Sequence, residues 1–575
     1  MEVSAEEALK EIKEKYNKII EGVLKQLTRG VDMLFERQLL HDMMEMSPPG
    51  LDELIALSKL NDILKENEFD RVIIDTSAGA HTIRLIELPE LIDEWLVQSY
   101  RVLKKNSRMM KVDDVINLVL ELRVDIKKLQ ESLFSSEHAS FIAITIPEEM
   151  GVSITERMID GFDARGIVCD NIVVNFVISS DTDCRFCNLK RQEQQKIIRK
   201  MQKKLQQNII EVPLFQHQIV GNKLLRKFAQ VMFEGTLIQK TFDLELKPLV
   251  FDATRTEESP KLDLDERNFV LFGGKGGCGK TTSSAATGLY MARRGKKTLV
   301  VSIDPQNSLS DSFNQQLSDA ITQINGIKNL YALEMDAEKL LKAWRDENRD
   351  VLIEIAENGM YMEREDIAQF LDLSLPGMDE LMALRKLQEI LKKNEYDLII
   401  LDTAPTGHTL RFLDLPNQMD EWLKIMSTMH SKRRYVLTTF FGRRARLLTM
   451  RPDTFLKENS EDIKRIKNIL TSRNTEFVPV TILETMAIEE TTRLMKTLKS
   501  YKIPMRQIIC NGLVPNSISC KYCIPRRKMQ QKELKAVQKK FSDYTIVKMP
   551  LFPHDIRGID DLSLFGTILF DENEI

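Results

Sequence analysis

The residues best suited to chemistry in this chain lie in one glycine-rich stretch, residues 273–282 (GGKGGCGKTT). Glycines allow successive backbone N–H groups to turn toward phosphate oxygens, and a following helix N-terminus adds partial positive charge. We expect Lys280 to reach the β and γ phosphates of ATP and the Thr281 hydroxyl to bind Mg²⁺. The stretch predicts a nucleotide site made of Gly274, Gly276, Gly277, Gly279, Lys280, Thr281 and Thr282.

Such a loop must be held between a strand and a helix. Residues 268–272 (NFVLF) form an apolar run typical of a strand, and residues 281–295 (TTSSAATGLYMARRG) have a helical pattern. A chance glycine-rich loop has no reason to occur in this context, so we interpret the stretch as a P-loop.

Most of the chain consists of two similar copies in tandem. Residues 72–96 (VIIDTSAGAHTIRLIELPELIDEWL) match residues 399–423 (IILDTAPTGHTLRFLDLPNQMDEWL), and further matches follow in the same order. Similarity over this length indicates duplicated domains rather than a short-period solenoid. We predict a degenerate first half at 1–250, a polar linker at 251–266 and a complete domain at 267–575.

Both copies alternate short β-branched runs with long helical patterns. Apolar runs without polar alternation, separated by helices, are typical of parallel sheets covered on both faces. We therefore predict the α/β class: two tandem P-loop-type, three-layer domains whose parallel sheets are flanked by helices. The strands are expected at 297–304, 396–402, 477–482 and 507–511, and two of the helices at 462–470 and 489–501.

A second lysine, Lys275, lies inside the loop, where an ordinary P-loop requires no such charge. With it, the sequence resembles the deviant-P-loop ATPases that include ArsA, the arsenite-pump ATPase, and the targeting factor for tail-anchored membrane proteins. The resemblance covers nearly the whole chain. It implies that Lys275 reaches across a dimer interface to the opposite nucleotide.

The resemblance also implies two switches. Residues 302–311 (SIDPQNSLSD) match the first, where Asp304 would orient the attacking water, and Asp402 begins the second, where it would support Mg²⁺ through water. One departure is residues 304–307 (DPQN), where the family usually has Ala-His; it affects the behaviour expected of the first switch, not nucleotide binding. The family holds adenine at the positions of Asn511, Pro550 and Phe552.

The first copy, as printed, has no counterpart of the P-loop strand, its helix or the first switch, because Met1 aligns with Leu333. Residues 77–80 (SAGA) replace residues 404–407 (APTG), so we expect no hydrolysis there. Two explanations stay open. The altered switch favours a half that lost nucleotide binding, whereas the cost of unpaired backbone groups favours a segment upstream of Met1.

Two CxxC motifs occupy equivalent places in the two copies. Each pair is half of a tetrahedral thiolate site, so two pairs that meet would make a Cys₄ zinc site from Cys184, Cys187, Cys520 and Cys523. A redox disulfide is the alternative. The resemblance implies zinc, since the targeting ATPases clamp two subunits at such motifs. We expect Cys169, Cys278 and Cys510 to be packing residues.

The client is indicated by two conflicting features. Tandem duplication is typical of the arsenite branch of the family, whereas CxxC motifs are typical of the tail-anchored targeting branch. The cysteines that the arsenite branch places after its switches have no equivalent here, and arsenite is a soft, thiol-seeking species. Methionine-rich stretches at 39–57, 375–384 and 422–430 suit either an apolar helical client or a core. The basic stretch 432–451 suits either a solvated loop or a membrane contact.

Composition sets the remaining limits. The chain has 43% hydrophobic and 29% charged residues and a net charge of −4, so nothing attracts nucleic acid in general. Seven cysteines and no apolar leader favour a cytoplasmic protein in a reducing environment, rather than a disulfide scaffold, with peripheral contact with a membrane at most. We predict an ATP-hydrolysing switch with Mg²⁺ and zinc that delivers tail-anchored clients to a membrane receptor. The alternatives are an ATPase driving a membrane arsenite or antimonite pump, and a scaffold with feeble hydrolysis. Pairing within one chain and homodimerisation both stay open.

Overall fold

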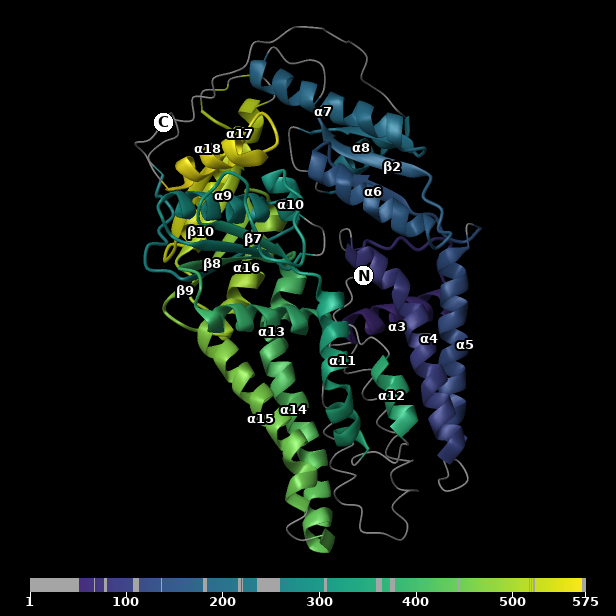
Figure 1. Cartoon of the computed structure of the whole chain (residues 1–575). Helices are drawn as coiled ribbons and strands as arrows, with labels where there is room; N and C mark the ends of the chain where they lie inside the picture. Colours follow the sequence, from purple (N-terminus) through teal and green to yellow (C-terminus); the bar gives the residue numbers. More distant parts are fainter. Residues whose placement is uncertain are drawn as a thin grey trace. The chain divides into compact units, whose positions relative to one another are not determined.

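The computed structural model falls into two compact units (Figure 1). One unit comprises Met1–Ala139, Ala337–Ile390 and Phe412–Asn468, and the other comprises Ser140–Asp336, Leu391–Arg411 and Ile469–Ile575. Each unit therefore draws on both sequence copies. The structure describes residues 51–66, 68–76, 80–106, 113–135, 137–178, 184–215, 219, 221–234, 259–304, 308–357, 364–372, 378–441, 445–516, 518, 520 and 523–570.

The second unit contains an eight-stranded sheet in the order β11-β10-β9-β4-β8-β5-β7-β6. All of its neighbouring strands are parallel except β6 and β7, so the predicted parallel sheet is confirmed apart from one antiparallel edge. The strands are β4 (Phe269–Gly273), β5 (Thr298–Ser302), β6 (Thr322–Gln323), β7 (Leu330–Glu334), β8 (Leu398–Asp402), β9 (Thr475–Ile482), β10 (Gln507–Leu513) and β11 (Thr545–Pro550).

Strand β4 lies between β8 and β9 and is buried along its whole length. Burial on both faces explains why its sequence is apolar without alternation. Helix α9 (Lys280–Arg293) follows it and packs with α18 (Gly558–Phe570), so that strand, loop and helix form one buried unit. The helices on the sheet also include α10 (Ser308–Phe313), α16 (Thr485–Ser500) and α17 (Cys523–Lys540).

A smaller sheet of the same unit comes from the first copy. It has the order β1-β2-β3, all parallel, with strands β1 (Ile142–Thr145), β2 (Asn171–Val177) and β3 (Asn208–Pro213). Its helices are α6 (Glu149–Asp163), α7 (Arg185–Lys204) and α8 (Asn222–Glu234), so its elements follow the same order as β9, α16, β10, α17, β11 and α18.

The duplication extends to single hydrogen bonds. The Gln194 amide accepts from the N–H of Ile178 at 2.9 Å and donates to the Phe176 carbonyl at 3.0 Å. Its counterpart Gln530 does the same with Val514 and Gly512, at 2.9 Å in both cases. Phe176 adopts φ 64° where Gly512 adopts 73°, so the first copy keeps a left-handed turn without the residue that suits it.

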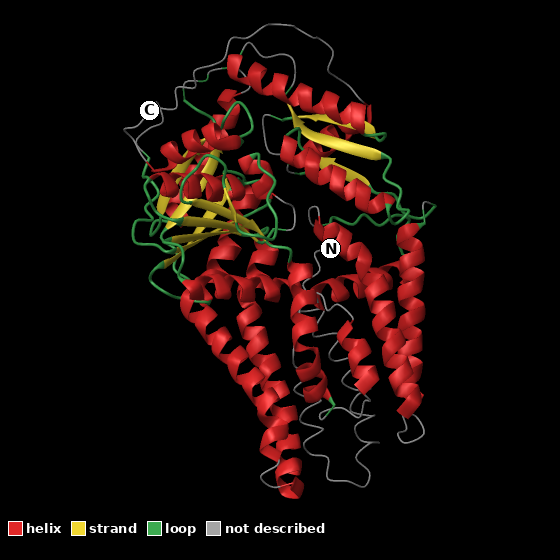
Figure 2. Cartoon of the chain, in the orientation of Figure 1, coloured by secondary structure: helices red, strands yellow, loops and turns green. Residues whose placement is uncertain are grey.

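The first unit is helical in the part that the structure describes (Figure 2). Leu57, Leu88 and Leu129 pack together among its first three helices. No helix within the described ranges combines the length and apolar character that crossing a membrane requires. The helices that lie wholly or partly in this unit are α3 (Leu51–Glu66), α4 (Ala80–Asn106), α5 (Asp113–Phe134), α11 (Ala337–Ala356), α12 (Arg364–Asp372), α13 (Met378–Lys393), α14 (Thr406–Phe441) and α15 (Ala445–Leu470).

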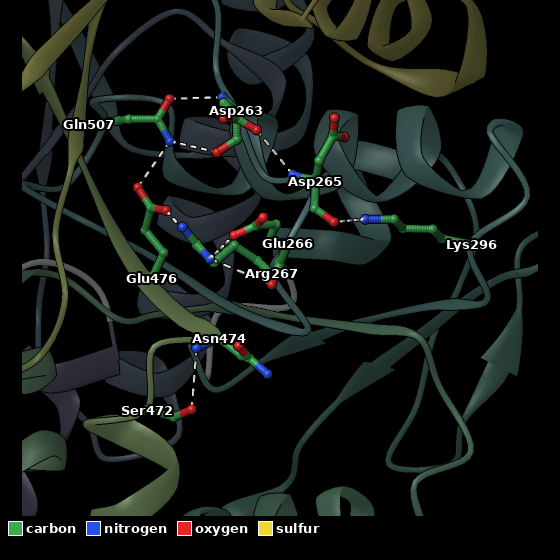
Figure 3. Close-up of polar contacts among 9 residues, drawn as sticks. All are labelled: Asp263, Asp265, Glu266, Arg267, Lys296, Ser472, Asn474, Glu476 and Gln507. Carbon is green, nitrogen blue, oxygen red and sulfur yellow. Dashed lines mark hydrogen bonds and ion pairs between the residues drawn. The ribbon is translucent and has the colours of Figure 1, made fainter.

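Polar contacts hold the chain that enters β4 against residues at the starts of β9 and β10 (Figure 3). Asp263 exchanges two 2.8 Å hydrogen bonds with the Gln507 side chain, and Gln507 also donates to Glu476 at 2.9 Å. Arg267 forms a buried ion pair with Glu476 at 3.0 Å. Residues 259–266, the C-terminal part of the predicted linker, therefore pack against the domain that follows, and the domain boundaries stay a prediction.

Candidate functional site

The glycines of the loop have two kinds of surroundings. A Cβ at Gly279, where φ is 94°, would lie 2.2 Å from the Asn511 amide nitrogen, and a Cβ at Gly274 would lie 2.0 Å from the Val480 carbonyl oxygen. Gly276 and Gly277 instead have nothing within 4 Å of an added Cβ. The loop therefore packs tightly on one side and presents open backbone on the other, as an approaching phosphate requires.

The first residues of α9 place a cation and a hydroxyl in this site. Lys280 is buried, and its Nζ donates to the Lys275 carbonyl at 3.4 Å, a long hydrogen bond. The Thr281 hydroxyl donates to Asp402 Oδ2 at 2.8 Å. Because Thr281 follows β4 and Asp402 ends the neighbouring strand β8, adjacent parallel strands bring their carboxyl ends, and these two side chains, together.

Asp402 is fully buried, and burial raises its pKa to about 7 although Lys280 and the Thr281 hydrogen bond oppose the shift. Ser284 also donates to this carboxylate, at 3.3 Å. The buried Asp402 carboxylate and the Thr281 hydroxyl offer oxygen donors that suit a hydrated Mg²⁺, which prefers oxygen ligands.

The first switch begins in the same place. Asp304 follows β5, its N–H donates to the Ser302 hydroxyl at 3.2 Å, and its charge contributes to the raised pKa of Asp402. The Ser308 hydroxyl lies 3.4 Å from the Thr281 hydroxyl. Residues 305–307, where the sequence departs from the family pattern, lie outside the described part.

The far end of that switch is tied to the end of the sheet. Arg557 donates to the Asp311 carbonyl at 3.1 Å and to its carboxylate at 3.3 Å. Burial raises the pKa of Asp311, and Arg557 opposes the rise. The sequence places Asp311 at the end of the first switch, but it does not predict the pairing with Arg557, which lies 246 positions farther along the chain. Ser284 and Ser308 carry no sequence signal of their own beyond lying near the motifs.

Of the three predicted adenine residues, Asn511 borders the P-loop, and the other two lie at the end of β11 and just after it. Asn511 donates to the Cys278 carbonyl at 3.0 Å, so its amide borders the P-loop. Pro550 ends β11 and is paired with Leu513. Phe552 is buried against Phe565, with ring centroids 5.8 Å apart. The adenine role of these residues stays a prediction.

The four cysteines of the two CxxC motifs meet within one chain. Their Sγ atoms all lie within 4.8 Å of one another, between the first turns of α7 and α17. Leu214, Leu551 and Val514 are among the apolar residues packed around them. Cys187 lies 3.2 Å from Cys523 and 4.0 Å from Cys520.

The chemistry of this cluster suits a soft cation. A hydrogen bond from the Cys187 thiol lowers the pKa of Cys523 below that of an ordinary thiol, which favours a thiolate in the cluster. Four sulfur ligands in a small, apolar-walled space are compatible with tetrahedral zinc.

The remaining cysteines are packing residues, as predicted. Cys169, Cys278 and Cys510 are all buried, and burial raises the pKa of Cys510 to about 12. Such thiols are poor nucleophiles and poor metal ligands.

The methionine-rich stretches, the altered switch of the first copy and the basic stretch are described only in part. Met382 and Met426 are buried, which fits the core interpretation of the methionines. Residues 39–50 and 77–79, and the side chains of 431–450, lie outside the described part.

Comparison with known proteins gives three kinds of match. The family model described as anion-transporting ATPase matches residues 1–234 and 267–571. ATPase ARSA1 of Chlamydomonas reinhardtii is 28% identical over 588 residues, which cover 94% of this chain and 72% of that protein. ATPase get3 of Pyrenophora tritici-repentis is 34% identical over 319 residues, 54% of this chain and 92% of its own. ATPase ASNA1 homolog 1 of Paramecium tetraurelia is 34% identical over 313 residues, 53% of this chain and 93% of its own.

Proposed function

Because this chain belongs to the anion-transporting ATPase family, we propose that it hydrolyses ATP at residues 273–282 and uses the turnover to change the surface offered to a client. The hydrogen bond from Thr281 to Asp402 carries the proposal, since it joins the P-loop helix directly to the start of the second switch. Loss of the γ phosphate would therefore alter the contacts of Asp402, the last residue of β8, and so the position of α14, which begins at Thr406.

Each residue of the site has a distinct task in this proposal. Lys280 binds the β and γ phosphates, and the open backbone at Gly276 and Gly277 donates to their oxygens. Thr281 and, through water, Asp402 would hold Mg²⁺, which would neutralise charge at the phosphates. Asp304 orients the attacking water, and Lys275 supplies a cation to a nucleotide across a dimer interface.

A tail-anchored membrane protein is the client that the chemistry of this chain favours. Outside the CxxC cluster, each of the three other thiols is buried separately, so they do not form a metalloid site. The cluster itself is a candidate for zinc, which we propose as a structural ion. The protein would then act in the cytoplasm and meet a membrane receptor at the membrane surface.

Client-stimulated turnover tests the proposal. A peptide of about 20 apolar residues, presented by a soluble carrier, should bind the ATP-loaded chain and be released after hydrolysis. Arsenite and antimonite should leave turnover unchanged both in the unaltered chain and in a Cys169→Ala control. Stimulation by either metalloid, lost on replacing Cys184 and Cys187 by serine, would instead favour the arsenite-pump alternative.

A further inference from the structure

One edge of the small sheet is apolar and exposed. In the part of the chain that the structure describes, β1 pairs with β2 alone. Its alternate residues Ile142 and Ile144 are 56% and 69% exposed, whereas Ala143 between them is buried. A strand edge has unpaired backbone N–H and C=O groups, and with apolar side chains beside them it can pair with another strand.

In the second copy, the positions equivalent to Ile142 and Ile144 are buried. Aligning Thr145 with Thr481 places Ile142 and Ile144 opposite Val478 and Val480, and both valines are fully buried. They belong to the same apolar cluster as Val270 and Phe272 of β4 and Ala285 and Leu289 of α9, which supply their cover.

Helix α8 also exposes apolar side chains whose counterparts in the second copy are covered. Leu225 and Phe233 are 51% and 78% exposed. Their counterparts on α18 are Leu562, which is fully buried, and Phe570, which stacks on Tyr290 of α9 with ring centroids 4.4 Å apart. Two separate elements of the first copy therefore expose the side chains that contact β4 and α9 in the second.

A third segment, in the other unit, gives independent support. Residues 71–76 correspond to β8, the other neighbour of β4, yet they make no strand pairing among the described residues. Ile73 is 95% exposed, whereas its counterpart Ile400 is fully buried. Both neighbours of β4 thus have exposed counterparts in the first copy.

We propose that β1 and α8 form a docking surface for a strand–loop–helix segment of polypeptide with the chemistry of Phe269–Arg293. The strand adds parallel to β1, with the residue equivalent to Phe272 opposite Ile142, because Phe272 pairs with Val478 in the second copy. Its helix covers Ile142, Ile144, Leu225 and Phe233. The proposal rests on exposure and internal repetition, and it is independent of the proposed function.

The second copy also defines the helix that fits. A Cβ at Gly288 would lie 2.4 Å from the Val300 side chain, and α9 approaches closely through small residues. Ala229 replaces Gly566, whose added Cβ would lie 3.1 Å from the Ala286 carbonyl oxygen, so the docked helix lies a little farther out. The segment must therefore combine an apolar strand with a helix of alanine, glycine and serine, rather than bulky residues.

The experiment adds a labelled peptide of residues 267–295 carrying Lys280→Ala to the 575-residue chain. Hydrogen exchange of the β1 amides that do not donate to β2 should slow at least tenfold on binding, while the exchange of β9 stays unchanged. Ile144→Glu should weaken peptide binding at least tenfold. It should leave the thermal midpoint unchanged, because that side chain is largely exposed. Met486→Glu is the matched control, since Met486 is a 73% exposed apolar residue of the second copy, and it should bind the peptide normally.

Four results would overturn the docking surface. They are free-edge amides of β1, those that do not donate to β2, that are already protected in the chain alone, a peptide that gives no protection, binding that Ile144→Glu leaves intact, and self-association of the chain that Ile144→Glu abolishes. A scrambled peptide that protects β1 equally well would also refute the required strand–helix pattern.

Discussion

The hydroxyl of Thr281 lies 2.8 Å from the carboxylate of Asp402, and this hydrogen bond joins two motifs that are 121 residues apart in the sequence. Thr281 belongs to the helix that follows the P-loop, and Asp402 ends the strand that leads into the second switch. Ser308 of the first switch is also within reach of the same hydroxyl. One threonine side chain is therefore shared by the phosphate loop and both switches.

Lys280→Ala should abolish ATP binding and turnover, because the β and γ phosphates lose their principal cation. We expect turnover to fall by about 10²-fold or more, measured together with nucleotide affinity. Lys328→Ala removes an exposed lysine of the same domain and should leave both unchanged. Unaltered hydrolysis in the Lys280 variant would exclude this site.

Asp304→Asn should separate binding from chemistry. The phosphate contacts remain, so ATP should bind with nearly normal affinity, whereas turnover should fall by roughly 10²- to 10⁴-fold as the water loses its orientation. Single-turnover kinetics with pre-bound ATP distinguish these steps. A variant that no longer binds ATP would show that Asp304 has a structural role instead.

The cysteine cluster should hold about one zinc ion per chain, since all four Sγ atoms come from a single chain. Replacing Cys520 and Cys523 by serine should remove the metal and lower the thermal midpoint, and Cys169→Ala should retain the metal. Elemental analysis under reducing conditions gives the stoichiometry. A metal-free protein with a disulfide at these positions would support the redox alternative.

Lys275→Ala should bind ATP but hydrolyse it slowly. If second copies of two chains pair, each Lys275 meets a nucleotide, and specific activity should rise with protein concentration. Loss of a comparable cation in trans is worth roughly 10³- to 10⁵-fold in rate. Fast turnover that depends neither on concentration nor on Lys275 would refute a role for this lysine across the interface.

Arg267→Met should destabilise the protein by about 3–5 kcal/mol, because it leaves Glu476 buried without its cation. Burial already raises the pKa of Glu476 against the opposing effects of Gln507 and Arg267. The double change Arg267→Met with Glu476→Met should restore most of the free energy of unfolding, as measured by urea denaturation. Equal losses in the single and double variants would mean that the ion pair contributes nothing beyond packing.

The sequence by itself determined the local elements and their repetition. Glycine spacing and the flanking apolar runs predicted β4, the P-loop and α9, because strand, turn and helix propensities act over a few residues. The two CxxC motifs and the register between copies were equally visible, since duplication leaves residue types in a common order.

Only the tertiary structure decided which distant groups meet and which are left uncovered. The contacts of Thr281 with Asp402 and of Asp311 with Arg557, and the meeting of the four cysteines, depend on strand order and helix packing. The sequence could not predict the antiparallel β6, because a strand of two residues gives no periodic signal. It could not predict the exposure of Ile144 either, because apolar strands look alike in sequence whether or not a neighbouring strand covers them. Burial is a property of the assembled sheet, so sequence patterns specify the side chains that need a partner, while the fold determines whether they find one.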